Sequence, residues 1–163
     1  MKIEFATLND VAQLNELYFK CSENMKQKYG LNHWDSAYQQ EILTNRINSK
    51  QVHVVKNDGQ IIASFMLVKE YPQPYIDAIG IDDIPFTYLN RLAVTPELQG
   101  QGTGKWCMKQ LEEISISSGS KVLRLDILDN YKQLMHFYES IGYKQIGKGK
   151  TRRFQILFYQ KYL

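Results

Sequence analysis

The sequence predicts a mixed α/β fold in which helices flank a mostly antiparallel central sheet. Apolar runs of strand length alternate with longer stretches whose apolar residues recur every three or four positions. Residues 52–56 and 60–68 flank a turn ending in Asp58 and Gly59, which is typical of an antiparallel hairpin. Further on, a glycine-rich turn joins a strand to a helix that precedes a nearly continuous apolar strand. This pattern predicts a βαβ crossover.

The N-terminal part is predicted to form one strand and two helices. Residues 2–6 alternate between polar and apolar, and Thr7 with Asp10 resembles a capping box. The next segment carries apolar side chains at helical spacing: Val11, Leu14, Tyr18, Cys21 and Met25. Gly30 is expected to end this helix. Ser36 is predicted to cap a second helix, with Tyr38, Ile42 and Ile47 on its apolar face.

The remaining elements follow in the same way. Residues 71–85 contain three of the four prolines and no regular period, so they are predicted to form a loop. A strand is expected at 87–95. After the glycine-rich turn, Cys107, Met108, Leu111 and Ile114 mark a helix that Gly119 ends. We then expect a buried strand at 122–128, a helix at 132–141, and strands at 143–147 and 152–161.

Length and composition fit one globular domain, residues 1–163, with 44% hydrophobic and 23% charged residues. No apolar run is long enough to cross a bilayer and no signal peptide is recognisable, so a cytoplasmic protein with no membrane partner is expected. Cys21 and Cys107 lie in helical patterns, which favours buried thiols over a disulfide or a metal site. A net charge of +3 does not indicate a nucleic-acid partner. The late basic residues are predicted to form a solvated edge: Lys144, Lys148, Lys150, Arg152 and Arg153.

The glycine-rich turn is the strongest functional signal. It consists of Gln99, Gly100, Gln101, Gly102, Thr103, Gly104 and Lys105. Backbone N–H groups that small residues leave uncovered at a helix N-terminus favour a phosphate. A Walker loop is excluded, because Gln99 stands where its first glycine belongs and Trp106 where its hydroxyl residue belongs. The even spacing of the glycines also departs from the dinucleotide fingerprint.

Two motifs resemble those of the GNAT acetyltransferase superfamily. Gln99-x-x-Gly102-x-Gly104, preceded by the strand segment Leu92, Ala93 and Val94, is similar to its acyl-CoA-binding motif. Tyr138, followed four residues later by Gly142 and an aromatic residue, is similar to its second signature. The order of elements agrees over essentially the whole chain. The resemblance implies an N-acetyltransferase that uses acetyl-CoA, needs no metal and acts on a primary amine of a small molecule or a peptide.

The resemblance also implies roles for individual residues. The amides from Gly100 to Lys105 would hold the coenzyme A pyrophosphate, with Gln99 at the entry of the turn. The backbone of residues 92–94, kinked or bulged, would pair with the pantetheine arm. Tyr138 would donate a proton or a hydrogen bond to the departing thiolate. The alternative for Tyr138 is a tyrosine that merely packs beside Phe137.

Three further positions leave alternatives open. The family usually has an asparagine seven residues before the tyrosine, but here Tyr131 holds that place and Asn130 precedes it. Asn130 or Tyr131 would contact the pantetheine arm, or Asn130 caps the next helix. Asp126 is the candidate base, since some relatives use a carboxylate there; its alternative is a pairing with Arg124 or a backbone amide. Tyr88 stands where other relatives carry a glutamate and would orient a water instead.

The acceptor is expected to bind at the first helices and the long loop. Aromatic and acidic side chains there suit a cationic amine: His33, Trp34, Tyr71, Tyr75, Asp77, Asp82 and Asp83. Trp34, Tyr75, Asp77 and Tyr88 are the predicted acceptor-binding residues, and solvated acids with a core tryptophan are the alternative. The main rival function is a non-catalytic acyl-CoA-binding module; nucleic-acid binding is weaker. The aromatic C-terminal strand either packs internally or extends into a homodimer.

Overall fold

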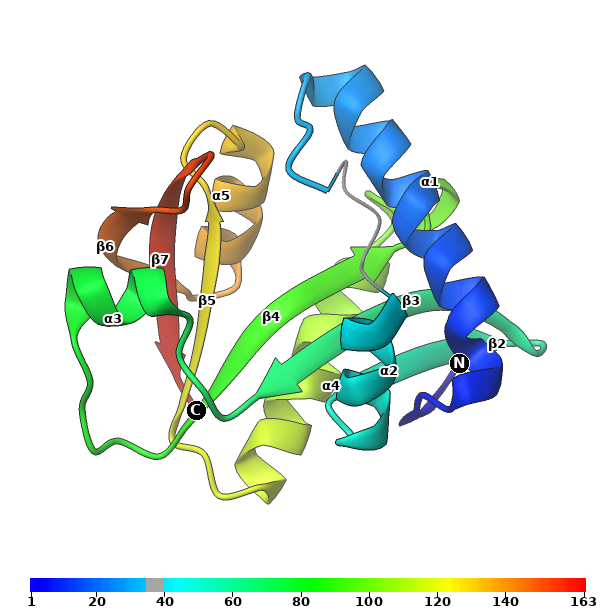
Figure 1. Ribbon diagram of the computed structural model, residues 1–163, viewed down its shortest axis with the longest axis horizontal. Helices are drawn as coiled ribbons and strands as arrows, with labels where there is room; N and C mark the ends of the chain where they lie inside the picture. The colour runs from blue at the N-terminus through cyan, green and yellow to red at the C-terminus, as the bar shows by residue number, and fades with distance from the viewer. Residues whose placement is uncertain (35–39) are drawn as a thin grey trace. The chain divides into compact units, whose positions relative to one another are not determined.

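The computed structural model describes residues 1–34 and 40–163, and these divide into two compact units. Unit 1 comprises Met1–Leu67 and Arg91–Cys107, and unit 2 comprises Val68–Asn90 and Met108–Leu163. Strand β4 (Phe86–Val94) and helix α4 (Thr103–Ser117) contribute to both units. Within the described residues, seven strands form one sheet in the order β1-β2-β3-β4-β5-β7-β6 (Figure 1). The predicted mixed, mostly antiparallel sheet is confirmed.

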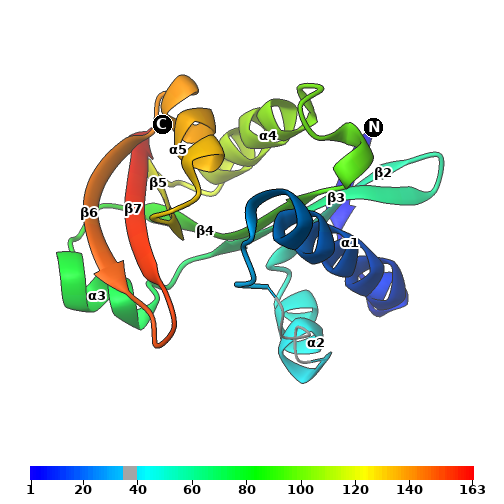
Figure 2. The ribbon, with the colours of Figure 1, turned by 90° about the horizontal axis from the view of Figure 1, so that it is seen from above.

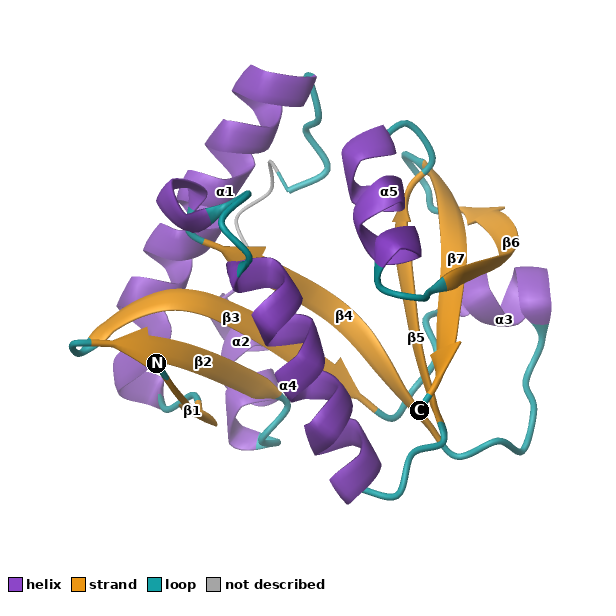
Figure 3. Cartoon of the chain, turned by 180° about the vertical axis from the view of Figure 1, so that it is seen from behind, coloured by secondary structure: helices purple, strands orange, loops and turns teal. Residues whose placement is uncertain are grey.

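Unit 1 contains three antiparallel strands, and helices α1 and α2 lie between the first and the second of them in the chain. Strand β1 (Lys2–Phe5) pairs with β2 (Val52–Asn57), which pairs with β3 (Gln60–Val68) (Figure 3). Asp58 and Gly59 have φ of 49° and 80°, the conformation of a two-residue hairpin turn. The Thr7 N–H donates to Asp10 at 2.8 Å, so the predicted capping box is confirmed before η1 (Leu8–Asp10) and α1 (Val11–Tyr29). Gly30, with φ of 67°, ends α1 as predicted.

Helix α2 (Gln40–Asn48) differs in part from the prediction. Leu43 and Ile47 are buried and form its apolar stripe, because residues four positions apart lie on one helix face. Ile42 is 43% exposed, so its predicted place in the stripe is wrong. The predicted cap Ser36 and the predicted stripe residue Tyr38 lie outside the described residues.

Unit 2 carries the crossover. Strand β5 (Val122–Leu128) runs parallel to β4, with Phe86 opposite Val122 and Leu89 opposite Leu125, and α4 connects the two strands as predicted. Strand β7 (Gln155–Tyr162) pairs antiparallel with β5 on one side and with β6 (Lys144–Lys150) on the other. Both edges of β7 are paired and Phe158 is fully buried, so this strand packs internally within unit 2.

The segment predicted as a loop contains helix α3 (Gln73–Ile79). The loop prediction is wrong here because Pro72 is the N-cap and Pro74 lies in the first turn, where a helix needs no N–H group from proline. Helix α3 packs beside β6 (Figure 2). A Cβ at Gly147 of β6 would come within 2.3 Å of the terminal methyl of Ile79 on α3, so the Ile79 side chain would have to shift.

The two cysteines are buried free thiols, as predicted, and burial raises the pKa of both Cys21 and Cys107 to about 12. In the part of the chain that the structure describes, no helix combines the length and apolar character needed to cross a bilayer.

Candidate active site

The glycine-rich turn in unit 1 has a backbone that favours glycine. After η2 (Pro96–Leu98), Gly100 and Gly102 have φ of 75° and 88°, and α4 begins at Thr103. A Cβ at either glycine would meet no atom within 4 Å. Glycine is therefore favoured here for its left-handed conformation and not for lack of space.

The same turn presents hydrogen-bond donors. Trp106 N–H donates to the Gly102 carbonyl at 2.9 Å, whereas the N–H groups of residues 100–105 have no acceptor among the described residues. These donors precede or open the first turn of a 15-residue helix, whose dipole also favours an anion. Lys105 is exposed in that turn and adds a positive charge. The turn is thus suited to a diphosphate.

Gln99 fastens the turn to the end of β4. Its Nε2 donates to the Val94 carbonyl at 2.8 Å, and its Oε1 accepts from Asn24 of α1 at 3.0 Å. Cys21 Sγ donates to the same Val94 carbonyl at 3.2 Å. The structure therefore brings residues 92–94 and the turn together, with α1 as a support that the sequence reasoning missed. The bulge near 92–94 stays a prediction.

In unit 2, Tyr88 and Asp126 form a close pair. The Tyr88 hydroxyl donates to Asp126 Oδ1 at 2.5 Å, and Tyr88 is fully buried. Burial raises the pKa of the Asp126 carboxyl, and the hydrogen bond from Tyr88 opposes that shift. Burial and the neighbouring carboxylate raise the pKa of Tyr88. Asp126 therefore pairs with Tyr88, and the predicted alternative of a pairing with Arg124 is wrong.

Tyr138 lies on α5 (Lys132–Ser140) and is only 4% exposed. Its ring packs edge-on against Phe137 and Tyr143, with ring centroids 5.1 and 5.6 Å apart. Within the described residues its hydroxyl has no hydrogen-bond partner, whereas the Tyr143 hydroxyl donates to Glu112 at 3.0 Å. Burial, with a smaller contribution from the charge of Asp126, raises the pKa of Tyr138. Tyr138 thus keeps its proton at neutral pH and has a donor to offer.

Helix α5 begins one residue later than a cap at Asn130 would require. Its N-cap is Tyr131, whose carbonyl accepts from Met135 N–H at 3.1 Å, with no side-chain cap. The predicted alternative that Asn130 caps the helix is therefore wrong. Asn130 is exposed and makes no hydrogen bond within the described part of the chain.

The predicted acceptor-binding residues have different local surroundings. In unit 1, Trp34 lies against Arg91, whose guanidinium carbon is 4.1 Å from the ring centroid. In unit 2, Tyr75 is 1% exposed and its ring lies 6.0 Å from that of Tyr88, so it belongs to the core. Asp77 is exposed on α3 and accepts from Gln73 of the same helix at 2.7 Å.

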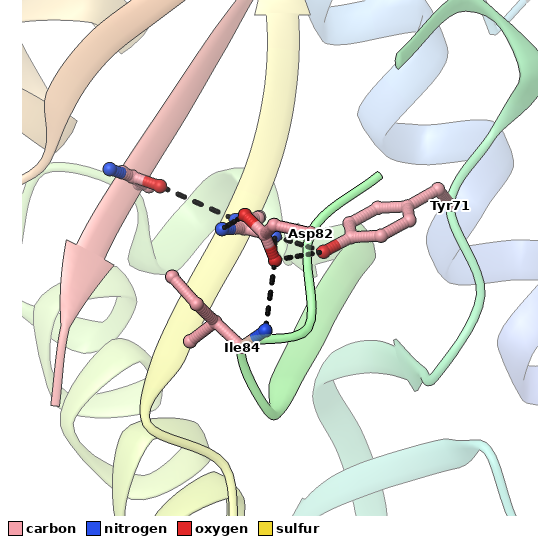
Figure 4. A network of polar contacts seen from close by, with 5 residues as sticks. Tyr71, Asp82 and Ile84 are labelled. Atoms are coloured by element: carbon pink, nitrogen blue, oxygen red, sulfur yellow. Dashed lines mark hydrogen bonds and ion pairs between the residues drawn. The ribbon is translucent and has the colours of Figure 1, made fainter. Parts of the chain in front are cut away.

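Asp82, from the loop after α3, holds a buried arginine that the sequence reasoning did not single out (Figure 4). Arg124 is 2% exposed and donates to both Asp82 oxygens, at 3.1 and 2.5 Å. It also donates to the Tyr71 hydroxyl and, from Nε, to Gln160 at 3.3 Å. The Arg124 guanidinium holds the pKa of Asp82 below its usual value. An arginine on an apolar strand was the available signal, but its partner lies 42 residues away.

Among residues 1–34 and 40–163, no group of three or more His, Cys, Asp and Glu side chains is placed to hold a metal ion. The model of the acetyltransferase (GNAT) family matches residues 11–143 of the chain. The chain belongs to this family.

Two relatives of this chain are named N-acetyltransferases. It is 30% identical to the uncharacterized N-acetyltransferase YesJ of Bacillus subtilis over 148 residues, which cover 87% of this chain and 81% of YesJ. It is 36% identical over 63 residues to the thialysine N-epsilon-acetyltransferase of Bos taurus. That match covers 39% of this chain and only 37% of the bovine protein.

Solved structures show the same fold. A GNAT-family acetyltransferase of Listeria monocytogenes aligns with a TM-score of 0.81 and 21% identity over 99% of this chain and 94% of that one. The PaiA N-acetyltransferase of Thermoplasma acidophilum, solved in complex with coenzyme A, aligns with a TM-score of 0.76 and 20% identity over 99% and 98%.

Proposed function

We propose that this GNAT member transfers the acetyl group of acetyl-CoA to a primary amine. The observation that carries the proposal is the run of N–H donors at residues 100–105, which opens helix α4 and has no acceptor among the described residues. These donors suit the pyrophosphate of coenzyme A. The coenzyme A complex of a structural neighbour supports the cosubstrate, and the relative named for thialysine supports an amine acceptor.

The amine nitrogen attacks the thioester carbonyl directly, so the C–N bond forms and the C–S bond breaks. The buried thiols of Cys21 and Cys107, with pKa values of about 12, are poor candidates for an acyl-enzyme nucleophile. In this proposal the backbone of residues 92–94 aligns the pantetheine arm like an added strand, and an N–H group there stabilises the developing oxyanion.

Tyr138 assists the leaving thiolate by donating a hydrogen bond. Ordinary pKa values are about 10 for tyrosine and about 8.5 for a thiol, so complete proton transfer is uphill by about 2 kcal/mol. Burial raises the Tyr138 pKa further and makes transfer harder. Its hydroxyl lacks a partner within the described residues and thus has a donor to give.

Asp126 accepts the amine proton, directly or through a water that Tyr88 orients. A base matters because deprotonating an α-amine of pKa near 8 at pH 7 costs about 1.4 kcal/mol, against about 4.6 for a lysine-like amine. The raised pKa of Asp126 strengthens it as a base. Asn130 or Tyr131 remains our candidate for a contact to the pantetheine arm.

Thiol release from acetyl-CoA across small amines, amino acids, polyamines and peptides tests this function, together with calorimetry of coenzyme A binding. Release that depends on one acceptor class, with formation of the N-acetyl product, is the expected result. Tight coenzyme A binding without release for any acceptor would overturn the enzyme and favour the non-catalytic acyl-CoA-binding module.

A further inference from the structure

Tyr88 on β4 directs its hydroxyl at the candidate base. The hydroxyl donates to Asp126 Oδ1 at 2.5 Å. The exposed fraction of Tyr88 is 0%, whereas Asp126 is half-buried. A tyrosine has a single proton to donate, and Tyr88 gives it to the carboxylate. Tyr88 is therefore placed to act on the reaction through Asp126.

Three further aromatic rings hold the Tyr88 side chain in place. Tyr71 stacks between Tyr75 and Phe86, with centroid distances of 4.5 and 3.9 Å and interplanar angles of 5° and 6°. Tyr71 and Tyr75 also meet the Tyr88 ring edge-on, with centroids 6.4 and 6.0 Å away. Because rings packed in this way leave Tyr88 few rotamers, its hydroxyl is fixed where it meets Asp126.

The Arg124 cluster fixes the middle ring of this stack. Arg124 donates to the Tyr71 hydroxyl and to both oxygens of Asp82 (Figure 4). Arg124 lies two residues before Asp126 on β5, so both side chains project from the same face of the sheet. The network of contacts thus runs from Arg124 through Tyr71 to Tyr88 and ends at the candidate base.

The other carboxylate oxygen of Asp126, Oδ2, has no hydrogen-bond partner in the described chain. A hydrogen bond donated to a carboxylate stabilises the ionised form, which is the form that can take a proton. We propose that Tyr88 is a positioning residue that keeps Asp126 ionised and turned so that Oδ2 receives the proton of the amine. This inference rests on the proposed function, in which Asp126 is the base.

The ionisable groups that interact with this pair keep their charge state at mildly acidic pH. Burial raises the pKa of the neighbouring tyrosines, which keep their protons: Tyr71, Tyr75 and Tyr138. Arg124 stays charged, and its guanidinium holds the pKa of Asp82 below its usual value. A change in the acidic part of a pH profile after substitution of Tyr88 therefore reports the titration of Asp126.

The first test is the pH dependence of kcat/KM for Tyr88→Phe, with an acceptor amine of low pKa. Loss of the hydrogen bond should raise the pKa of Asp126, so the acidic limb should move to higher pH by about one unit. The alkaline plateau should stay within about threefold, whereas a damaged fold would lower kcat/KM equally at all pH values. Tyr159→Phe is the matched control, because Tyr159 is also fully buried in unit 2 and donates to a carboxylate, that of Glu139 at 3.1 Å. It should leave the limb in place.

A second variant keeps the ring at this position. Tyr88→3-fluorotyrosine has a more acidic hydroxyl and hence a stronger donor, so the acidic limb should move to lower pH. A limb that stays in place in both Tyr88 variants would overturn the positioning role.

Carbon-13 NMR of the Asp126 carboxyl in the coenzyme-free protein makes the test independent of turnover. The signal is assigned by its absence in Asp126→Asn, and its titration midpoint should rise by about one unit in Tyr88→Phe. An unchanged midpoint would overturn the inference even if the limb moved. A midpoint that moves while the limb stays in place would overturn Asp126 as the base of the proposed function, but would leave Tyr88 as the residue that keeps it ionised.

Discussion

The glycine-rich turn of unit 1 and the Arg124 cluster of unit 2 differ in whether their polar groups have hydrogen-bond partners in the described chain. Around Arg124, a buried charge is matched by a bidentate carboxylate, a tyrosine hydroxyl and an amide oxygen (Figure 4). In residues 100–105, consecutive N–H donors meet no acceptor in the described chain. Because an unpaired buried polar group is costly, the paired network around Arg124 indicates stability, whereas the N–H donors of the exposed turn are available to a ligand. The comparison predicts which substitutions affect folding and which affect binding or turnover.

The largest effect is expected at Tyr138. This residue lies in unit 2, but its hydroxyl has no partner in the described chain, like the N–H groups of the glycine-rich turn and unlike the polar groups around Arg124. Tyr138→Phe removes a hydroxyl without a partner in the described chain, so we expect kcat to fall about 100-fold with little change in the free energy of unfolding. The coenzyme A Kd should stay within about twofold. Tyr143→Phe is the matched control, since that hydroxyl is already bound to Glu112 and its loss should mainly affect stability. Normal turnover in Tyr138→Phe would exclude the proposed role.

The second prediction concerns substitutions that disrupt the Arg124 cluster. Asp82→Ala leaves a guanidinium that is 2% exposed without its carboxylate, and we expect a loss of about 2 kcal/mol in the free energy of unfolding. The expected loss is below that of a fully buried pair because the Asp82 side chain is 41% exposed. Arg124→Met should cost less, about 1 kcal/mol, because Asp82 can hydrate.

Urea unfolding of both single variants and the double variant measures this asymmetry, and Asp77→Ala on the exposed face of α3 is the control, expected within about 0.5 kcal/mol. A cost for Asp82→Ala as small as that of the control would show that the network does not stabilise unit 2.

The third prediction concerns Asp126, which accepts a hydrogen bond from Tyr88 and is also the proposed base. Its carboxylate form accepts the proton, so kcat/KM should fall as the pH drops through its pKa, which burial raises above the ordinary value. Asp126→Asn should remove this acidic limb and lower kcat/KM about tenfold, less than for a sole base because Tyr88 and water can still relay a proton. An acceptor amine with a low pKa keeps its own titration out of the profile. An unchanged acidic limb in Asp126→Asn would exclude Asp126 as the base.

Local patterns predicted much of this molecule because their physical cause is local. The capping box of Thr7 and Asp10, the Asp58–Gly59 turn and the glycine-rich turn each depend on residues within a few positions. Pairings over long separations were missed: Asn24 with Gln99 are 75 residues apart, and Asp82 with Arg124 are 42 apart. Periodicity does not reveal such partners. Helix α3 was missed because the prolines at its N-cap and in its first turn are also typical of loops.

The smallest expected effect separates backbone strain from ligand binding. Gly102 and Gly59 have φ of 88° and 80°, and a Cβ at either would meet no atom within 4 Å. Alanine at either position should therefore cost about 1 kcal/mol of stability through the same left-handed strain. Only Gly102→Ala disturbs the open donors, so we expect it alone to raise the coenzyme A Kd, by about fivefold. Calorimetry and urea unfolding on both variants give the comparison. Equal changes in Kd would mean that the turn does not bind the coenzyme, because the strain common to both variants would then account for the whole effect.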